Sequence, residues 1–177
     1  MTPSPRLAAT SRRPAAAGRP RLMGWRAALT ALGSLLIALP AARADSVAAP
    51  KLPAYSQECG ACHLAYPPGL LPAASWQRLM VGLPKHFGSD ASLDPATRQA
   101  LADWLTAHAG SFKKVARDPT PPPQDRISQS PWFVREHREL PAAVWKRPAV
   151  GSAANCAACH AGAAQGRFSE HDINIPK

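Results

Sequence analysis

The sequence predicts a mainly α-helical protein with two small lobes, and three observations support this fold class. Apolar residues recur at helical spacing in several segments, whereas no stretch of useful length alternates as a β-strand would. A short motif, CGACH at 59–63, returns almost unchanged as CAACH at 156–160. A proline-rich stretch, 118–131, separates the two copies. We therefore expect one lobe around each motif.

The first 44 residues of the 177-residue chain do not have the pattern of a folded element. They contain seven arginines and no acidic residue, then the apolar run AALTALGSLLIALP at 27–40, and then small residues that end at Ala44. This run is shorter than the ~20 residues that a membrane-spanning helix requires. The pattern predicts an export signal at 1–44 that is cleaved after Ala44, and hence a periplasmic protein. An uncleaved membrane anchor is the alternative.

Removal of this segment would change the charge balance. The whole chain has a formal net charge of +10 and a pI near 10.2. Residues 45–177 keep 14 of the 21 basic residues and all 11 acidic residues, which leaves a net charge of +3. Most of the high pI therefore belongs to the export segment, and we expect no nucleic-acid partner.

Three helices can be placed in the remaining chain. In the first, 73–83, apolar residues recur at positions i, i+3, i+4 and i+7. The second begins after the capping residue Asp94, has a proline at its first position, and ends at Gly110. The third begins after Ser130, again with a proline at its first position, and ends before Pro141.

The proline-rich stretch lies between the second and third helices. Its five prolines favour an extended connector over a packed element. The expected domains are an N-terminal lobe at 45–117, a linker at 118–131 and a C-terminal lobe at 132–177.

All four cysteines of the protein lie in the two repeated motifs. C-x-x-C-H is the attachment signature of c-type haem. The spacing fits the chemistry, because two thiols one helical turn apart can each form a thioether to a haem vinyl group, and the next histidine then meets the iron. A thioredoxin-like dithiol, a structural zinc site and a disulfide framework fit this context less well. The predicted attachment and proximal-ligand residues are Cys59, Cys62 and His63 for haem 1, and Cys156, Cys159 and His160 for haem 2.

The sixth ligand of each iron decides what the protein can do. Only Met80 remains after the predicted cleavage, so the two irons cannot both have methionine. Met80 also lies on the apolar face of its helix, where filling the core is its expected role. His86 follows that helix in a loop that can enter a haem face. We predict it as the distal ligand of haem 1; an exposed loop histidine is the alternative.

His137 lies among charged residues in the third predicted helix. On a helical wheel at about 100° per residue it falls near Phe133, Val134 and Leu140, and its charged neighbours, 135, 136, 138 and 139, fall on the other side. We predict that this apolar face meets haem 2 and that His137 is its distal ligand. A buried histidine with a hydrogen-bond partner would show the same pattern.

Two further histidines keep the distal assignment open. His108 lies on an apolar helix face and is the alternative distal ligand, although in the last helical turn it can also bond a free carbonyl group. His171, near the C-terminus, is expected on the surface.

The segments CGACH, WQRLMVGLPKHFGSDASLD, WFVREHREL, CAACH and GRFSEHDINIP together resemble the small periplasmic dihaem cytochromes c. The resemblance covers nearly the whole predicted mature chain. It implies an N-terminal lobe like class I cytochrome c, an irregular C-terminal haem lobe packed against it, and bis-histidine iron at both haems. It also implies electron transfer with redox partners, namely a monohaem oxygen-binding cytochrome c and a membrane b-type cytochrome.

We therefore expect a periplasmic electron carrier with two six-coordinate haems and no small-molecule substrate, working between a membrane donor and a soluble redox partner. A dihaem peroxidase-like enzyme or a haem-based sensor, with one labile distal ligand, is the alternative. Lys113, Lys114 and Arg117 form a basic cluster that is a candidate for docking an acidic partner.

Overall fold

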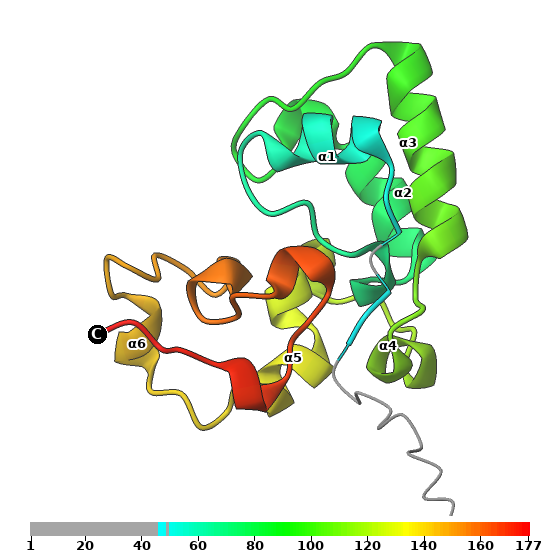
Figure 1. The fold of residues 1–177 in the computed structure, drawn as a ribbon. Helices are drawn as coiled ribbons and strands as arrows, with labels where there is room; N and C mark the ends of the chain where they lie inside the picture. Colours follow the sequence, from blue (N-terminus) through cyan, green and yellow to red (C-terminus); the bar gives the residue numbers. More distant parts are fainter. Residues whose placement is uncertain (1–45, 49) are drawn as a thin grey trace, which may run out of the picture. The chain divides into compact units, whose positions relative to one another are not determined.

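The computed structural model describes residues 46–48 and 50–177, whose path Figure 1 shows as a ribbon. Helices and turns provide its regular structure, and the described residues contain isolated β-bridges but no strand. The mainly helical prediction is thus confirmed. The predicted export segment lies outside the described residues. Among the described helices, none is both long and apolar enough to cross a membrane.

The first half of the described chain contains three α-helices and two short 3-10 helices. They are α1 (Pro53–Gly60), η1 (Pro68–Leu70), α2 (Ala73–Val81), η2 (Leu83–Lys85) and α3 (Pro95–His108). α3 begins as predicted, because the Asp94 side chain accepts hydrogen bonds from the N–H groups of Ala96 and Thr97 at 3.1 and 3.0 Å. It ends before Gly110, whose φ of +65° suits glycine and whose N–H donates to the Leu71 carbonyl at 2.8 Å.

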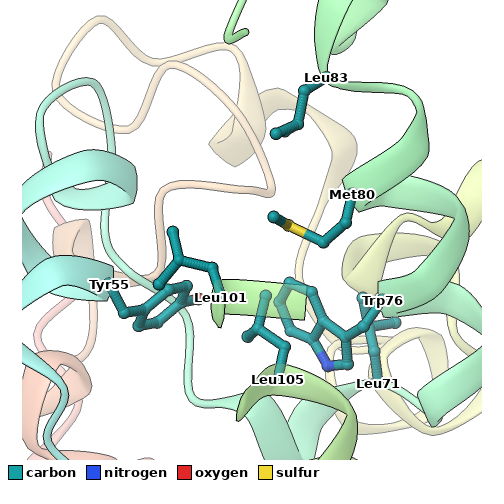
Figure 2. Packing of buried hydrophobic residues seen from close by; sticks show 7 residues of the cluster. All are labelled: Tyr55, Leu71, Trp76, Met80, Leu83, Leu101 and Leu105. Carbon is teal, nitrogen blue, oxygen red and sulfur yellow. The ribbon is translucent and has the colours of Figure 1, made fainter. Parts of the chain in front are cut away.

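One hydrophobic core joins these helices, as Figure 2 shows. Leu101 and Leu105 of α3 are each 1% exposed, and they face Trp76 and Met80 of α2 across the core. Burial of such a side chain stabilises the fold by roughly 1.5–3 kcal/mol. Met80 therefore fills the core, as predicted. The seven buried members are Tyr55, Leu71, Trp76, Met80, Leu83, Leu101 and Leu105.

A second buried cluster joins segments that are far apart in the sequence. Val47, Leu70, Phe112 and Val115 form it, the last of them on α4 (Lys113–Arg117), and Trp132 and Phe168 pack against it. The ring of Phe112 meets the ring of Trp132 edge-on at 5.1 Å. The N–H of Val47 also donates to the Gly166 carbonyl at 2.8 Å. The C-terminal segments thus pack against the N-terminal ones through shared apolar contacts.

The last third of the chain is mostly irregular (Figure 1). Its regular elements are α5 (Pro131–Glu136), α6 (Ala142–Trp145), η5 (Cys156–Ala158), η6 (Ala163–Gln165) and η7 (Glu170–Asp172). α5 begins after Ser130 as predicted, although the Ser130 side chain forms no capping hydrogen bond. The helix does not continue toward Pro141 but ends at Glu136, with His137 as the C-cap. Pro141 disfavours the α conformation only at Leu140, whereas His137, with φ −110° and ψ 11°, already lies outside the helical region.

The proline-rich segment 118–131 is not the extended connector that its composition predicts. It contains the 3-10 helices η3 (Pro123–Asp125) and η4 (Ile127–Gln129). The Asp125 carboxylate accepts hydrogen bonds from Nε and Nη2 of Arg78 at 2.9 and 2.6 Å, and Ile127 packs against both buried clusters. The side chains of Asp125 and Ile127 thus anchor the segment to the fold, whereas its prolines only stiffen it. The domain boundaries around it remain a prediction.

Candidate haem sites

The first motif occupies the end of α1 and the turn that follows it, so Cys59, Cys62 and His63 come together on one short segment. The His63 ring stacks on the ring of Tyr66 with centroids 5.0 Å apart. Its Nδ1–H donates to the Leu64 carbonyl at 2.7 Å. A hydrogen bond at Nδ1 leaves Nε2 as the nitrogen that can bind iron.

His86 faces His63 from the loop between α2 and α3. Their ring centroids are 6.1 Å apart, with an interplanar angle of 25°. The loop is held by Leu83, which is 7% exposed in the core and whose carbonyl accepts the His86 N–H at 3.2 Å. Burial, and then the nearby His63 and Arg126, lower the pKa of His86. The neutral imidazole that this favours is the form that binds a metal.

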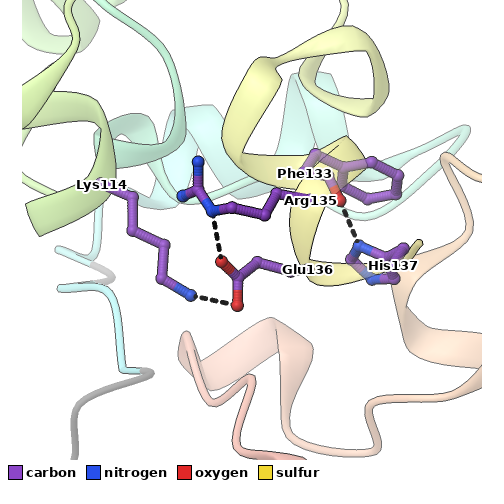
Figure 3. A network of polar contacts seen from close by, with 5 residues as sticks. All are labelled: Lys114, Phe133, Arg135, Glu136 and His137. Carbon is purple, nitrogen blue, oxygen red and sulfur yellow. Dashed lines mark hydrogen bonds and ion pairs between the residues drawn. The ribbon is translucent and has the colours of Figure 1, made fainter. Parts of the chain in front are cut away.

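The second motif lies on η5 and the residues after it, and its histidine faces the end of α5. The ring centroids of His160 and His137 are 6.2 Å apart, with an interplanar angle of 83°. The His137 ring stacks on Phe133 at 3.9 Å, and its Nδ1–H donates to the Phe133 carbonyl at 2.8 Å, as Figure 3 shows. Burial, and then His137, lower the pKa of His160, whose Nδ1 is buried without a hydrogen-bond partner.

Both histidine pairs have the spacing that a haem iron requires. Two imidazoles bonded to one metal from opposite sides, each through a bond of about 2 Å, have ring centres about 6 Å apart. The measured centroid separations of 6.1 Å and 6.2 Å meet this condition. The residues present thus fit an iron that lies between His63 and His86, and another between His160 and His137.

A cavity of about 320 Å³ surrounds the second histidine pair. Aromatic and aliphatic side chains dominate its lining, which suits a large apolar ring. Its apolar lining includes Phe112, Trp132, Phe133, Leu140, Trp145, Phe168, Ile173 and Ile175. Lys114 and Glu136, which pair at 2.8 Å (Figure 3), also line it, as do Glu139 and Glu170. The cavity therefore combines a mainly apolar wall with four charged side chains.

The wheel prediction for α5 needs two corrections. Val134 is 58% exposed instead of facing the cavity, because its side chain lies about 100° from Phe133 and the helix ends too soon to bury it. Glu136 and Glu139 line the cavity instead of lying on an outer face. Phe133 and Leu140 line it as predicted.

Comparison with known proteins identifies the family. The family of dihaem cytochromes c matches residues 55–168, which is more than half of the chain. The chain belongs to the dihaem cytochrome c family. It is accordingly an electron-transfer haem protein that carries two haem c groups. The search of curated protein sequences gave no match.

Solved dihaem cytochromes c have the same fold. A dihaem cytochrome c from Shewanella baltica OS155 is 38% identical, with 72% of this chain and 94% of that chain covered and a TM-score of 0.62. The dihaem cytochrome c from Rhodobacter sphaeroides is 42% identical, with 70% and 99% covered and a TM-score of 0.60. A second structure from R. sphaeroides is 44% identical, with 67% and 98% covered and a TM-score of 0.57.

Burial favours the neutral thiol at three of the four motif cysteines. Burial is the main cause that raises the pKa of Cys59 and of Cys156, each to about 11. Burial also raises the pKa of Cys159. Cys62 is exposed. All four cysteines are free of disulfide bonds, as thioether formation requires.

Neither of the two remaining histidines belongs to a facing pair. His108 ends α3, where its Nδ1–H donates to the Trp104 carbonyl at 2.8 Å and its ring contacts Trp104 at 4.9 Å. This hydrogen bond to a carbonyl group in the last helical turn is the alternative to iron binding that the sequence suggested for His108. His171 is exposed, as expected. In the basic cluster, Lys113 and Arg117 are exposed, whereas Lys114 pairs with Glu136.

Sequence reasoning missed Tyr66, which contacts both sites. Its ring stacks on His63, and its hydroxyl donates to the carbonyl of Ala154 at 2.7 Å, two residues before Cys156. Burial, and then the charge of Cys156, raise the pKa of Tyr66 to about 12, so the hydroxyl remains a donor. The sequence shows that Tyr66 is close to the first motif, but nothing in it indicates that the hydroxyl has a hydrogen-bond partner beyond the linker.

Proposed function

We propose that this chain is a periplasmic electron carrier whose two irons are each held by two histidines. His63 and His86 bind the iron of haem 1, and His160 and His137 bind the iron of haem 2. The observation that supports this proposal is the pair of ring separations, 6.1 Å and 6.2 Å, which suit one iron between each pair. Each haem, when bound, supplies an iron that alternates between ferric and ferrous states.

The protein side chains fix the state of these ligands. At His63 and His137 a backbone carbonyl accepts the Nδ1–H, which orients the ring and leaves Nε2 for the metal. Burial favours the neutral form of His86 and His160. With a histidine on each side of both irons, no substrate needs to bind iron, which favours a carrier over a peroxidase-like enzyme or a sensor.

The contacts of Tyr66 support electron exchange between the two sites. Its stacked ring and its hydroxyl bring the His63 segment and the Cys156 segment together within one side chain's length. We expect electrons to enter from a membrane donor and leave to a soluble partner. A membrane b-type cytochrome and a monohaem oxygen-binding cytochrome c are the proposed partners, and the exposed Lys113 and Arg117 would favour an acidic docking surface.

Ligand replacement tests the ligation. Low-temperature electron paramagnetic resonance of the ferric holoprotein should show two low-spin, bis-histidine haems. His86→Ala and His137→Ala should each convert one haem to the high-spin form, while His108→Ala, the matched control, should leave both unchanged. High-spin iron in His108→Ala, or rapid carbon monoxide binding by the wild type, would contradict the proposal and favour a labile distal ligand.

The proposed location needs its own experiment. Intact mass measurement of the exported holoprotein should give a chain that starts at Asp45 and carries two haem groups. Recovery of the uncleaved chain in the membrane fraction would support the membrane-anchor alternative instead.

A further inference from the structure

The turn that carries His86 has a strained backbone. Phe87 has φ +48° and Gly88 has φ +101°, and the N–H of Ser89 donates to the His86 carbonyl at 3.0 Å. Two central residues at positive φ are typical of a type I′ turn, in which glycine, asparagine and aspartate are favoured. Gly88 suits its position. Phe87 does not, because its Cβ crowds the following carbonyl in this region, so neighbouring groups must hold it there.

Arg126 supplies that support from outside the turn. Its guanidinium carbon lies 4.1 Å from the centroid of the Phe87 ring, well within the range of a cation–π contact. The same ring also contacts the His86 ring, with the two ring centroids 4.8 Å apart. Phe87 is 45% exposed, so core packing does not fix it. Its ring instead contacts both the distal histidine and an arginine from the proline-rich segment.

Arg126 is itself fixed by its neighbours in that segment. Its Nε donates to Oε1 of Gln124 at 3.1 Å, and its N–H donates to the Pro123 carbonyl at 3.2 Å. The preceding residue, Asp125, accepts the two hydrogen bonds from Arg78 on α2. The backbone of Arg126 is therefore anchored to the same helix that leads into the turn of His86.

The segment that presents Arg126 is strained as well. Gln124 and Asp125 both have φ +55°, which is a costly conformation for non-glycine residues. Such strain persists only where specific contacts maintain it, and here those contacts are the Arg78 pair and the stacking on Phe87. Two strained turns thus depend on one set of side chains, and they are joined by the contact of Arg126 with Phe87, the neighbour of the distal histidine.

We propose that Arg126, seated by the Arg78–Asp125 pair, is a positioning residue for the distal ligand of haem 1. The proposal rests on the assignment of His86 as that ligand. By covering Phe87, Arg126 keeps the turn closed and the His86 ring opposite His63, so that an external ligand displaces His86 only slowly. The distal ligand of haem 2 is held differently, because His137 stacks on Phe133 of its own helix.

Carbon monoxide binding to the reduced holoprotein tests this role. With Arg126→Ala we expect binding at least ten-fold faster than in the wild type, with an amplitude of one of the two haems. Arg126→Lys keeps the charge but loses the planar contact, so we expect most of the same increase. Arg98→Ala, which removes an arginine of α3 in the same lobe, should bind carbon monoxide at the wild-type rate.

A double-mutant cycle tests whether Arg126 acts on His86 through Phe87. Phe87→Ala alone should also accelerate binding, and Arg126→Ala should then add little, because the group that it covers is gone. A wild-type rate in Arg126→Ala, or fully additive effects of the two changes, would overturn the positioning role. Unchanged spectra of haem 2 in each variant show that the protein has folded.

The test also separates this inference from the ligation on which it rests. If paramagnetic resonance shows that ferric haem 1 of the wild type is not bis-histidine, the assignment of His86 fails, and the positioning role fails with it. If the wild type is bis-histidine and Arg126→Ala still binds carbon monoxide slowly, only the positioning role fails.

Discussion

The two halves of the molecule hold the same motif in different ways. The N-terminal half places CGACH beside a core of seven buried residues that all come from within 55–105, and five of them lie on helices of 8, 9 and 14 residues. The C-terminal half places CAACH among helices of 6 and 4 residues and short turns. Its own buried apolar side chains are Phe133, Val144, Val150 and Ala163.

This difference indicates that the halves depend on their cofactor to different degrees. Packing of α2 against α3 buries apolar surface without any cofactor. In the C-terminal half, the cavity around His137 and His160 lies where a core would be, with aromatic side chains lining it. A small irregular segment without a sufficient core needs a cofactor to offset the entropy of folding.

Loss of haem attachment should therefore have the largest effect, and it should be asymmetric. We expect Cys156→Ala with Cys159→Ala to remove haem 2 and unfold 132–177, because the apolar side chains around the cavity would then have no ring to pack against. Cys59→Ala with Cys62→Ala should leave α2 and α3 partly protected. Hydrogen exchange followed by mass spectrometry measures both outcomes. Equal loss of protection in the two halves would refute the asymmetry.

Truncation of the N-terminal core should have the next largest effect. Leu105 is 1% exposed at the centre of the α2–α3 contact, and Leu105→Ala should lower the free energy of unfolding by about 2–5 kcal/mol. Val81→Ala, on the same lobe but 73% exposed, should change it by less than about 0.5 kcal/mol. Denaturant titration of the holoprotein compares them. A small effect of Leu105→Ala would mean that haem 1, rather than this core, carries the stability of the lobe.

Local signals in the sequence were sufficient to place α2, α3 and the start of α5, whereas α1, α4 and α6 were not predicted. The Asp94 cap, the glycine at 110 and the proline after Ser130 act within one turn, so their effects follow from neighbouring residues alone. The cysteine motifs carry their chemistry in five consecutive residues. The placement of Met80 in the core likewise followed from helical spacing.

Contacts between distant segments were not predictable in the same way. The prolines of 118–131 indicated stiffness, but the hydrogen bonds of Asp125 to Arg78 depend on where the fold brings α2. The wheel for α5 assumed a helix longer than the one that forms, so it misplaced Val134, Glu136 and Glu139. Tyr66 was missed because its hydrogen-bond partner lies beyond the linker.

Tyr66→Phe should test the junction between the halves, with a smaller effect than core truncation. It keeps the ring on His63 and removes the hydroxyl that donates to Ala154, so we expect a loss of about 1 kcal/mol. Hydrogen exchange should increase in the segment that leads to Cys156. Tyr55→Phe is the matched control, because its hydroxyl donates to the Tyr66 carbonyl within one lobe. If both variants loosen the Cys156 segment equally, the hydroxyl of Tyr66 does not join the halves.

The anchor of the linker should have the smallest effect, and that effect should depend on pH. The hydrogen bonds from Arg78 are the main cause that lowers the pKa of Asp125. The stabilisation is therefore fully present above the pKa of about 3.9 of an unfolded aspartate, and it is lost as the pH falls through the lower folded-state pKa. Asp125→Asn should cost up to about 1 kcal/mol at pH 7, because the pair is partly exposed.

Denaturant titrations across a pH series check this dependence. The stability difference between wild type and Asp125→Asn should shrink as the pH falls below about 4, where the wild-type carboxylate begins to lose its charge in the unfolded chain. Asp90→Asn is a suitable control, because the pKa of Asp90 is lowered by a hydrogen bond from the nearby Ser92 and the group joins no distant segments. If the stability difference between wild type and Asp125→Asn persists in acid, the shape of the turn, and not the charge of Asp125, anchors the linker to the N-terminal half.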